Sequence, residues 1–421
     1  MVATSPRGRV QRIGSAAIHS ARWTAGVVAA VALVVGAGTT AAAAGTSRGG
    51  GVAGLLASFY RPPDPLPLAP PGALIRATII PSAGLLPAGA VAYRVLYHSQ
   101  SITGADIAVS GMVVVPGGTP PHGGFPIVAW AHGTTGLADQ CAPSLGGFTS
   151  IPSLDTFLEH GMIVAATDYE GLGTPGIHPY LVGQSEAQSV LDSARAAGNL
   201  VGMSASNQVA IVGFSQGGQA ALFSAQIAES YAPELFVAAT VAVAPVTSLD
   251  EFVPSRPTAG PDPDSAYALM ALDAWSKVYG NLPLSSALSD MVVRHSTAIP
   301  TQCSDALTTL YGATDVRRLF RVGWDSTPGV RTDAARNQPG QAPTSTPLLV
   351  VEGTMDRLTP YRTVTRFVAD ALCAAQDDTV QYVSFPGTGH DDVLSAAGST
   401  IVGWISGRLA LAPPHDTCRP R

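Results

Sequence analysis

Residues 209–220 read VAIVGFSQGGQA, and this stretch decides the fold class of the chain. A run of Val, Ile and Ala, typical of a buried strand, leads into G-x-S-x-G around Ser215, and a helix-like stretch follows. In such a strand-to-helix turn the serine hydroxyl stands clear of the sheet, and glycines let strand and helix approach closely. Gly213 and Gly217 occupy those positions. We therefore predict that Ser215 is a nucleophile; an ordinary glycine-rich turn is the alternative.

Apolar runs of strand length alternate with helical stretches from residue 90 onward. Several of these runs are continuous, as expected for parallel strands that are buried on both faces. The expected strands are Val91–Tyr97, Ile107–Val115, Pro126–Ala131, Met162–Thr167, Val209–Val212, Leu235–Ala244, Leu348–Val351 and Val380–Phe385, and the expected helices include Glu186–Leu200 and Gln216–Ser230. The alternation predicts an α/β fold with a doubly wound, mostly parallel sheet of the α/β-hydrolase type.

The N-terminal region is different in composition. Residues 1–44 contain four arginines, no acid and a long uncharged run that ends in small residues. This pattern predicts a signal peptide for export, and an uncleaved membrane anchor is the alternative. Residues 45–71 are rich in Gly, Ser and Pro, so we expect a linker or an extended arm.

A second interruption lies within the α/β pattern. Residues 247–344 contain many Pro, Ser and Asp, with helical pieces at Ser265–Tyr279 and Ser285–Val293. The stretch is too long for a simple loop. We therefore expect a mainly helical cap inserted between two parts of the hydrolase core, residues 72–246 and 345–421.

A nucleophilic serine needs a base, and in α/β-hydrolases the chain order is serine, acid, histidine. Three histidines follow Ser215. His295 falls in the expected cap and His415 lies in a proline-rich tail, whereas His390 lies in a loop of small residues directly after an expected strand. Such a loop can bring an imidazole over the turn, so His390 is the predicted base.

The acid that orients His390 is predicted to be Asp356, which follows an expected strand. Glu352, at the end of that strand, is the alternative. Asp391 and Asp392 are too close to His390 in sequence for the usual orienting geometry.

The developing oxyanion of an acyl-transfer reaction needs backbone or side-chain donors. The N–H of Gln216, at the start of the expected helix, is one predicted donor. The second donor is expected in the loop at residues 131–136, where Thr134 or Thr135 can supply a backbone N–H, a hydroxyl or both. The sequence leaves these two threonines open.

Composition excludes several classes of function. Hydrophobic residues make up 46% of the 421 residues, charged residues 12%, and the formal charge is −6. The chain can bury a large core, and its acidic balance argues against nucleic-acid binding, but not against apolar contact with a lipid surface. An even number of cysteines in an exported chain predicts two disulfides, with three pairings open, and no spacing suggests a zinc site. The cysteines are Cys141, Cys303, Cys373 and Cys418.

Four features together resemble the secretory lipase family, of which the fungal lipase A type is representative. Cys141–Ser144 (CAPS) follows the loop at residues 131–136, and Asp168–Gly173 (DYEGLG) follows the next expected strand. The nucleophile turn and the expected cap complete the resemblance, which extends over roughly residues 60–418.

The resemblance implies a Ser-Asp-His triad of Ser215, Asp356 and His390. It also implies an oxyanion donor at the position of Thr135. The fungal type has an acidic residue there, so this departure keeps Thr134 and Thr135 both open. The disulfides that the resemblance implies are Cys141–Cys303 and Cys373–Cys418.

These predictions combine into a secreted serine carboxylester hydrolase, a lipase for acylglycerols or related lipid esters, which requires no metal or organic cofactor. The expected partners are a lipid or small ester and a lipid–water interface, without nucleic acid or an obligate protein partner. The location is extracellular, with attachment to the cell envelope left open. The alternatives are a serine peptidase or acyltransferase of the same fold, and a catalytically silent surface-binding protein. The expected cap residues that either line an acyl pocket or pack the cap are Leu269, Met270, Leu272, Trp275 and Tyr279.

Overall fold

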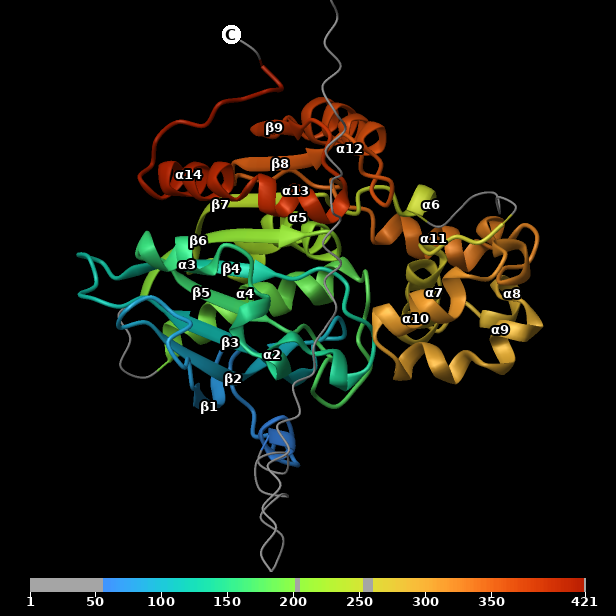
Figure 1. Cartoon of the computed structure of the whole chain (residues 1–421), viewed down its shortest axis with the longest axis horizontal. Coiled ribbons are helices and arrows are strands. Elements are labelled where there is room, and N and C mark those ends of the chain that lie inside the picture. Colours follow the sequence, from blue (N-terminus) through green and yellow to red (C-terminus); the bar gives the residue numbers. More distant parts are fainter. Residues whose placement is uncertain (1–55, 201–204, 253–259, 420–421) are drawn as a thin grey trace, which may run out of the picture. The chain divides into compact units, whose positions relative to one another are not determined.

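A computed structural model of the chain describes residues 56–200, 205–252 and 260–419. The predicted signal segment, residues 1–44, and part of the predicted linker lie outside these ranges. Within them, nine strands form one sheet in the order β1-β2-β3-β5-β4-β6-β7-β8-β9 (Figure 1). The strands are β1 Leu74–Ile80, β2 Val91–Gln100, β3 Asp106–Val115, β4 Phe125–Ala131, β5 Ile163–Thr167, β6 Ala205–Phe214, β7 Phe236–Val243, β8 Leu348–Gly353 and β9 Val380–Phe385.

The sheet is antiparallel at one edge and parallel elsewhere. β1, β2, β3 and β5 pair antiparallel in turn, whereas all pairs from β5 across to β9 are parallel. β5 and β8 are buried along their whole length, as the continuous apolar runs predict. The predicted α/β class with a mostly parallel sheet is confirmed.

Helices pack on both faces of the sheet. The helices of the described ranges are α2 Pro143–Gly146, α3 Leu154–Glu159, α4 Gly183–Asn199, α5 Gln216–Tyr231, α6 Leu249–Phe252, α7 Ser265–Tyr279, α8 Leu284–Ala287, α9 Asp290–Arg294, α10 Ser304–Gly312, α11 Pro328–Arg336, α12 Tyr361–Phe367, α13 His390–Ala396 and α14 Gly398–Leu409. The turns η2 Asp139–Cys141, η3 Phe148–Ser150, η4 Ser296–Thr301, η5 Val316–Arg318 and η6 Trp324–Ser326 are 3₁₀ helices, and η7 Val368–Ala375 is a π-helix. Apolar residues of α4 and α5 cover one face of the sheet, and those of α3, α13 and α14 cover the other (Figure 1). None of these helices is long and apolar enough to cross a membrane within the described ranges.

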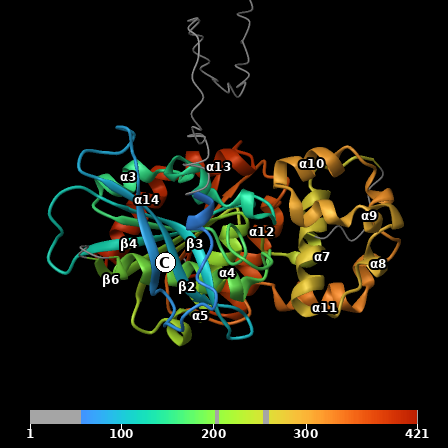
Figure 2. The same ribbon diagram turned by 90° about the horizontal axis from the view of Figure 1, so that it is seen from below.

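Helices α7 to α11 lie between β7 and β8 in sequence and share one apolar core, which also includes residues 180–182, Leu137, Val246 and Leu249 from outside these helices. Trp275 of α7 and Trp324 of η6 are among its fully buried side chains. Figures 1 and 2 both show these helices gathered together. We refer to them as the α7–α11 cluster; that it acts as a cap stays a prediction.

Two elements differ from the sequence-based expectation. β1 was not expected; it is an edge strand whose residues are partly exposed, so it lacks a buried apolar run. The single helix expected at Ser285–Val293 is two short helices. Leu288 is extended between them, and the hydroxyl of Ser289 caps α9 by accepting the N–H of Val292. A serine that caps a helix favours a new start over continuation.

Candidate active site

Ser215 lies in a strained turn between β6 and α5. Its backbone is left-handed, with φ 56° and ψ −115°. A Cβ at Gly213 would lie 1.8 Å from the carbonyl oxygen of Gly217, and a Cβ at Gly217 would lie 1.9 Å from that of Ala131. Only glycine fits at both positions, so the sequence G-x-S-x-G is required by the close approach of α5 to the ends of β4 and β6.

The structure brings Ser215, His390 and Asp356 into one chain of hydrogen bonds. The Oγ of Ser215 lies 2.9 Å from Nε2 of His390, and Nδ1 of His390 lies 2.7 Å from Oδ2 of Asp356. The three residues follow β6, β9 and β8, whose carboxyl ends meet at one edge of the parallel sheet. Because a carboxylate only accepts, Nδ1 of His390 carries the proton and Nε2 is free to accept the serine proton.

Asp356 is held as a carboxylate. Its side chain is buried, and Oδ1 accepts the N–H groups of Leu358 and Thr359 at 2.8 and 2.9 Å. The hydroxyl of Thr359 donates to Oδ2 at 2.9 Å. Burial favours the neutral acid, but the hydrogen bonds and charge of His390 together with the Thr359 donors lower the pKa of Asp356 below its ordinary value.

The other candidates are elsewhere. His295 is bonded to the carbonyl of Met291 in the α7–α11 cluster, and His415 is exposed in the C-terminal tail. Asp391 and Asp392 are exposed on the first turn of α13. None of these side chains is hydrogen-bonded to Ser215 or His390 in the described part of the chain.

Glu352, the alternative acid, is a buried carboxyl near Asp356. Its Oε1 accepts the N–H of Gly353 at 2.9 Å. Burial, then the charge of the nearby Asp356, raises the pKa of Glu352 to about 10. The group is therefore neutral at pH 7, which suits a supporting position beneath the acid rather than the role of the acid.

The raised pKa of Glu352 predicts a pH-dependent stability. A carboxyl whose pKa is higher in the folded than in the unfolded chain stabilises the fold below the unfolded value, and this contribution is lost as pH rises toward 10. Glu352→Gln is expected to remove this pH dependence, which amounts to at most about 1.4 kcal/mol of unfolding free energy per pH unit. Urea unfolding at pH 6 and pH 9 measures the effect, with the exposed Glu159→Gln as control. An equal loss of unfolding free energy in wild type and Glu352→Gln would contradict the assignment.

The loop at residues 131–136 lies beside the nucleophile turn and is fixed from outside the sheet. The hydroxyls of Thr134 and Tyr180 lie 2.8 Å apart and share a hydrogen bond, whereas Oγ1 of Thr135 is buried with no partner among the described residues. The carbonyl of Thr135 accepts the N–H of Ser304, at the start of α10, at 2.9 Å. The disulfide Cys141–Cys303 joins the same two regions, and Cys373–Cys418 joins η7 to the C-terminal tail.

The CAPS and DYEGLG motifs meet at one buried carboxylate. Asp168 accepts the N–H of Ser144 at 2.9 Å, the hydroxyl of Ser144, and the hydroxyl of Ser110 at 2.6 Å. These bonds anchor the segment after the 131–136 loop to the end of β5. The two motifs therefore support the loop rather than add a reacting group.

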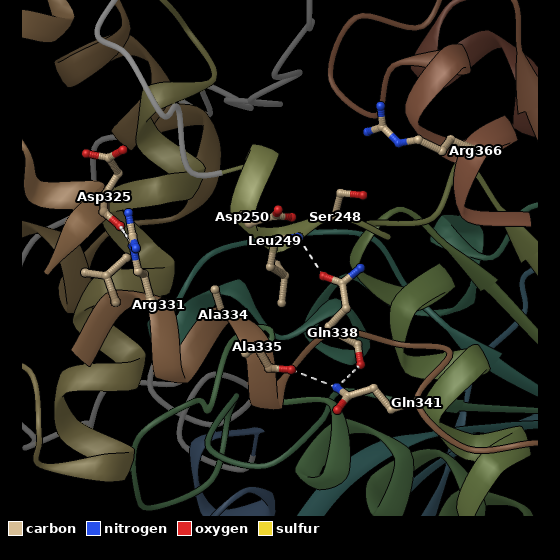
Figure 3. A pocket seen from close by; sticks show the side chains of 11 residues that line it. Ser248, Leu249, Asp250, Asp325, Arg331, Ala334, Ala335, Gln338, Gln341 and Arg366 are labelled. Carbon is tan, nitrogen blue, oxygen red and sulfur yellow. Dashed lines mark hydrogen bonds between the residues drawn. The ribbon is translucent and has the colours of Figure 1, made fainter. Parts of the chain in front are cut away.

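Two cavities differ in their relation to these residues. One cavity, of about 770 Å³, lies between α6, α11 and α12 (Figure 3). Within it, Oε1 of Gln338 accepts the N–H of Leu249. Neither the triad nor the 131–136 loop lines this cavity. A second, of about 360 Å³, is mainly apolar. Its lining residues include Thr134, Thr135, Phe214 and Leu394. The smaller cavity therefore adjoins the candidate site.

The described residues contain no group of three or more His, Cys, Asp or Glu side chains arranged to hold a metal ion. In the candidate site, Ser215, His390 and Asp356 supply a hydroxyl, an imidazole and an oriented carboxylate, the groups that nucleophilic catalysis by serine uses.

Comparison with known proteins decides the family. Residues 149–417, more than half of the chain, match the family model described as Secretory lipase. The chain belongs to the secretory lipase family. The family resemblance predicted from its motifs is therefore confirmed, and with it a lipase or esterase relationship.

Two curated relatives are similar to this chain over part of their length. A Mycobacterium tuberculosis (strain CDC 1551 / Oshkosh) protein named "Probable inactive lipase" is 30% identical over 206 residues, which are 45% of each chain. Lipase A of Moesziomyces aphidis is 26% identical over 210 residues, 46% of this chain and 44% of that protein. The matched region spans less than half the length of these two relatives.

The X-ray structure of Candida antarctica lipase A in its closed state shares the fold of this chain. The TM-score is 0.72 at 18% identity, covering 86% of this chain and 88% of that chain. This likeness shows the α/β-hydrolase fold.

Some residues of the candidate site in this member of the secretory lipase family were not predicted from the sequence. Thr359, Tyr180 and Glu186 each bond to a predicted site residue or to its neighbour. Their roles depend on contacts between distant segments, and only Thr359 has a local signal, since it lies three residues after Asp356.

Proposed function

We propose that this member of the secretory lipase family is a secreted serine carboxylester hydrolase that acts on acylglycerols or related lipid esters. The observation that carries the proposal is the 2.9 Å contact between Oγ of Ser215 and Nε2 of His390, on a serine with left-handed backbone. A serine hydroxyl on a strained turn, next to an oriented imidazole, is the arrangement that acyl transfer to serine requires.

The proposed reaction has two halves. In the first, Oγ of Ser215 bonds to the ester carbonyl carbon while Nε2 of His390 takes the hydroxyl proton. The carbon–oxygen bond to the alcohol then breaks, and His390 gives its proton to the leaving oxygen. In the second half, water attacks the acyl-enzyme, loses a proton to His390, and Ser215 recovers that proton as the acid leaves.

The oxyanion formed in each half needs two donors. The N–H of Gln216, the first residue of α5, is one, because the first N–H groups of a helix have no partner within it. We assign the other to Thr135, whose buried hydroxyl has no partner among the described residues, whereas the hydroxyl of Thr134 is hydrogen-bonded to that of Tyr180. Buried hydroxyls are normally hydrogen-bonded, so this one is explained if a substrate or water oxygen accepts its hydrogen bond.

Thr135→Val is expected to lower kcat by about 10²-fold, because one oxyanion donor is removed while shape is kept. Thr134→Val is the matched control and is expected to change kcat by much less. Steady-state hydrolysis of p-nitrophenyl butyrate measures both. A larger loss in Thr134→Val would reverse the assignment of the two threonines.

Lipid-like substrates are supported by the family and by the apolar cavity of about 360 Å³ beside the 131–136 loop. Leu269, Met270, Leu272 and Trp275 are buried in the core of the α7–α11 cluster, so packing explains them better than an acyl pocket. Secretion rests on residues 1–44, which lie outside the described ranges, and on the family. Attachment to the cell envelope has no support beyond the sequence.

Labelling with a fluorophosphonate and hydrolysis of p-nitrophenyl esters of short, medium and long acyl chains test the proposal. We expect one label per chain at Ser215 and faster hydrolysis of esters than of aminoacyl amides. Because one relative is named as an inactive lipase, a catalytically silent protein is the second candidate. It predicts no labelling, while faster cleavage of amides would indicate a peptidase.

A further inference from the structure

Glu186 is a fully buried carboxyl that the proposed reaction does not use. It lies in the first turn of α4, with no exposed surface. Its Oε1 accepts the N–H of Leu181 at 2.9 Å and the side-chain amide of Gln216 at 2.8 Å. Its Oε2 has no partner in the part of the chain that the structure describes. A buried carboxyl is unfavourable unless its contacts compensate, so its presence beside the nucleophile turn needs a reason.

The amide of Gln216 is held from two sides. Nδ1 of His178 lies 2.9 Å from the carbonyl of Glu170 and therefore donates to it, which leaves Nε2 as an acceptor. Nε2 of Gln216 lies 3.1 Å from that acceptor and 2.8 Å from Glu186, so both of its protons are used. The side chain next to Ser215 thus has one fixed orientation.

Residues 178–181, the segment that contains His178, also contact the loop expected to hold the second oxyanion donor. The hydroxyl of Tyr180 is bonded to that of Thr134. Leu181, the next residue, has a left-handed backbone with φ 54°, and its N–H is the one that Glu186 accepts. A non-glycine residue in this conformation persists only where its surroundings determine it. Glu186 therefore supports both the Gln216 side and the Thr134–Thr135 side.

We propose that Glu186 is a positioning residue that holds the two oxyanion donors in place, acting through Gln216 on one side and through residues 178–181 on the other. The inference rests on the proposed function, because it concerns the oxyanion of that reaction. Glu186 does not touch the substrate in this scheme.

The charge of Glu186 affects this role. Burial raises the pKa of Glu186 to about 8, so that the neutral acid is the form present at neutral pH. His178 and the tyrosines around it stay neutral near pH 8. Burial lowers the pKa of His178 to about 3 and raises those of Tyr169 and Tyr180 well above 10. Burial also raises the pKa of Tyr279 on α7. Glu170 accepts the hydroxyl of Ser185 at 2.5 Å, and burial raises the pKa of Glu170 above its ordinary value.

An ionised Glu186 places a negative charge next to the residue that donates to the oxyanion. Like charges in a water-poor site repel strongly, so the transition state is disfavoured when Glu186 loses its proton. We expect kcat of the wild type to fall as pH rises through about 8. Glutamine has the shape of the neutral acid and cannot ionise, so Glu186→Gln is expected to keep its kcat at pH 7 and to lack this fall.

The experiment measures kcat and KM on p-nitrophenyl butyrate from pH 6 to pH 10, with active sites counted by fluorophosphonate labelling. Glu186→Leu, which removes both hydrogen bonds, is expected to lower kcat roughly tenfold or more with little change in KM, less than the ~10²–10³-fold loss for a direct donor. Asp192→Asn is the matched control, a buried carboxyl on α4 that bonds to Ser99, Tyr231 and Arg195 instead. It is expected to keep the wild-type pH profile.

The outcomes separate the inference from the proposed function. An unlabelled wild type overturns both. A labelled wild type with unchanged kcat in Glu186→Leu overturns only the positioning role. If Glu186→Leu does not fold, Glu186→Gln decides: loss of the alkaline fall supports the inference, and a fall like that of the wild type overturns it.

Discussion

Ser215→Ala is expected to lower kcat for ester hydrolysis by about 10⁶-fold and to abolish fluorophosphonate labelling. The variant removes the only atom that bonds to the substrate carbon in the proposed reaction. Alanine fits the space of serine, and the turn around it is fixed by the close contacts of Gly213 and Gly217. The fold and the thermal unfolding midpoint should therefore stay close to those of the wild type, so that the loss reports chemistry alone.

Ser395→Ala is the matched control for this prediction. Ser395 is exposed on α13, less than two turns from His390, and its hydroxyl donates to the carbonyl of Asp392. We expect wild-type kcat and full labelling. If Ser215→Ala retained labelling equal to that of the wild type, another residue would be the nucleophile.

Asp356→Asn is expected to lower kcat by about 10⁴-fold. An amide nitrogen 2.7 Å from Nδ1 of His390 would donate to it and so favour the tautomer with the proton on Nε2. That tautomer cannot take the proton of Ser215. The loss should appear in kcat at every pH from 6 to 9, because the wrong tautomer is set by the amide and not by titration.

Asp391→Asn and Asp392→Asn are the controls for the acid. Both residues are exposed and lie next to His390 in sequence, so they test whether nearness in the chain is sufficient. We expect kcat within about threefold of the wild type, as for surface substitutions away from a site. A large loss in either control, with activity kept in Asp356→Asn, would move the acid to α13.

The sheet could be predicted because its central strands are buried on both faces. Continuous runs such as Leu348–Val351 and Val209–Val212 have one plausible environment, and the structure places both within buried strands. β1 has partly exposed residues on both faces and gives no such signal. The bounds of the helices in the α7–α11 cluster were harder to predict. A helix-capping residue such as Ser289 acts through a local hydrogen bond that competes with helix propensity.

The three candidate catalytic residues could be predicted because each follows the carboxyl end of a parallel strand, where neighbouring strands bring their loops together. The residues that surround and support these three could not be predicted from the sequence. Glu186 lies in the helix α4 with apolar and polar neighbours in sequence, and nothing local distinguishes it from an exposed acid. Its burial comes from the packing of α4 against the start of α5 and the segment 178–181, which are contacts between separate elements.

The attachment of the 131–136 loop has a mechanical consequence for the α7–α11 cluster. The Cys141–Cys303 bridge and the bond from Ser304 to Thr135 join the cluster to the sheet beside Ser215. A covalent link cannot slide, so any swing of the cluster away from the sheet must pivot near this link. The far side of the cluster travels furthest in such a swing, and the 131–136 loop moves least. Such a swing would leave the 131–136 loop, with Thr134 and Thr135, close to its place beside Ser215.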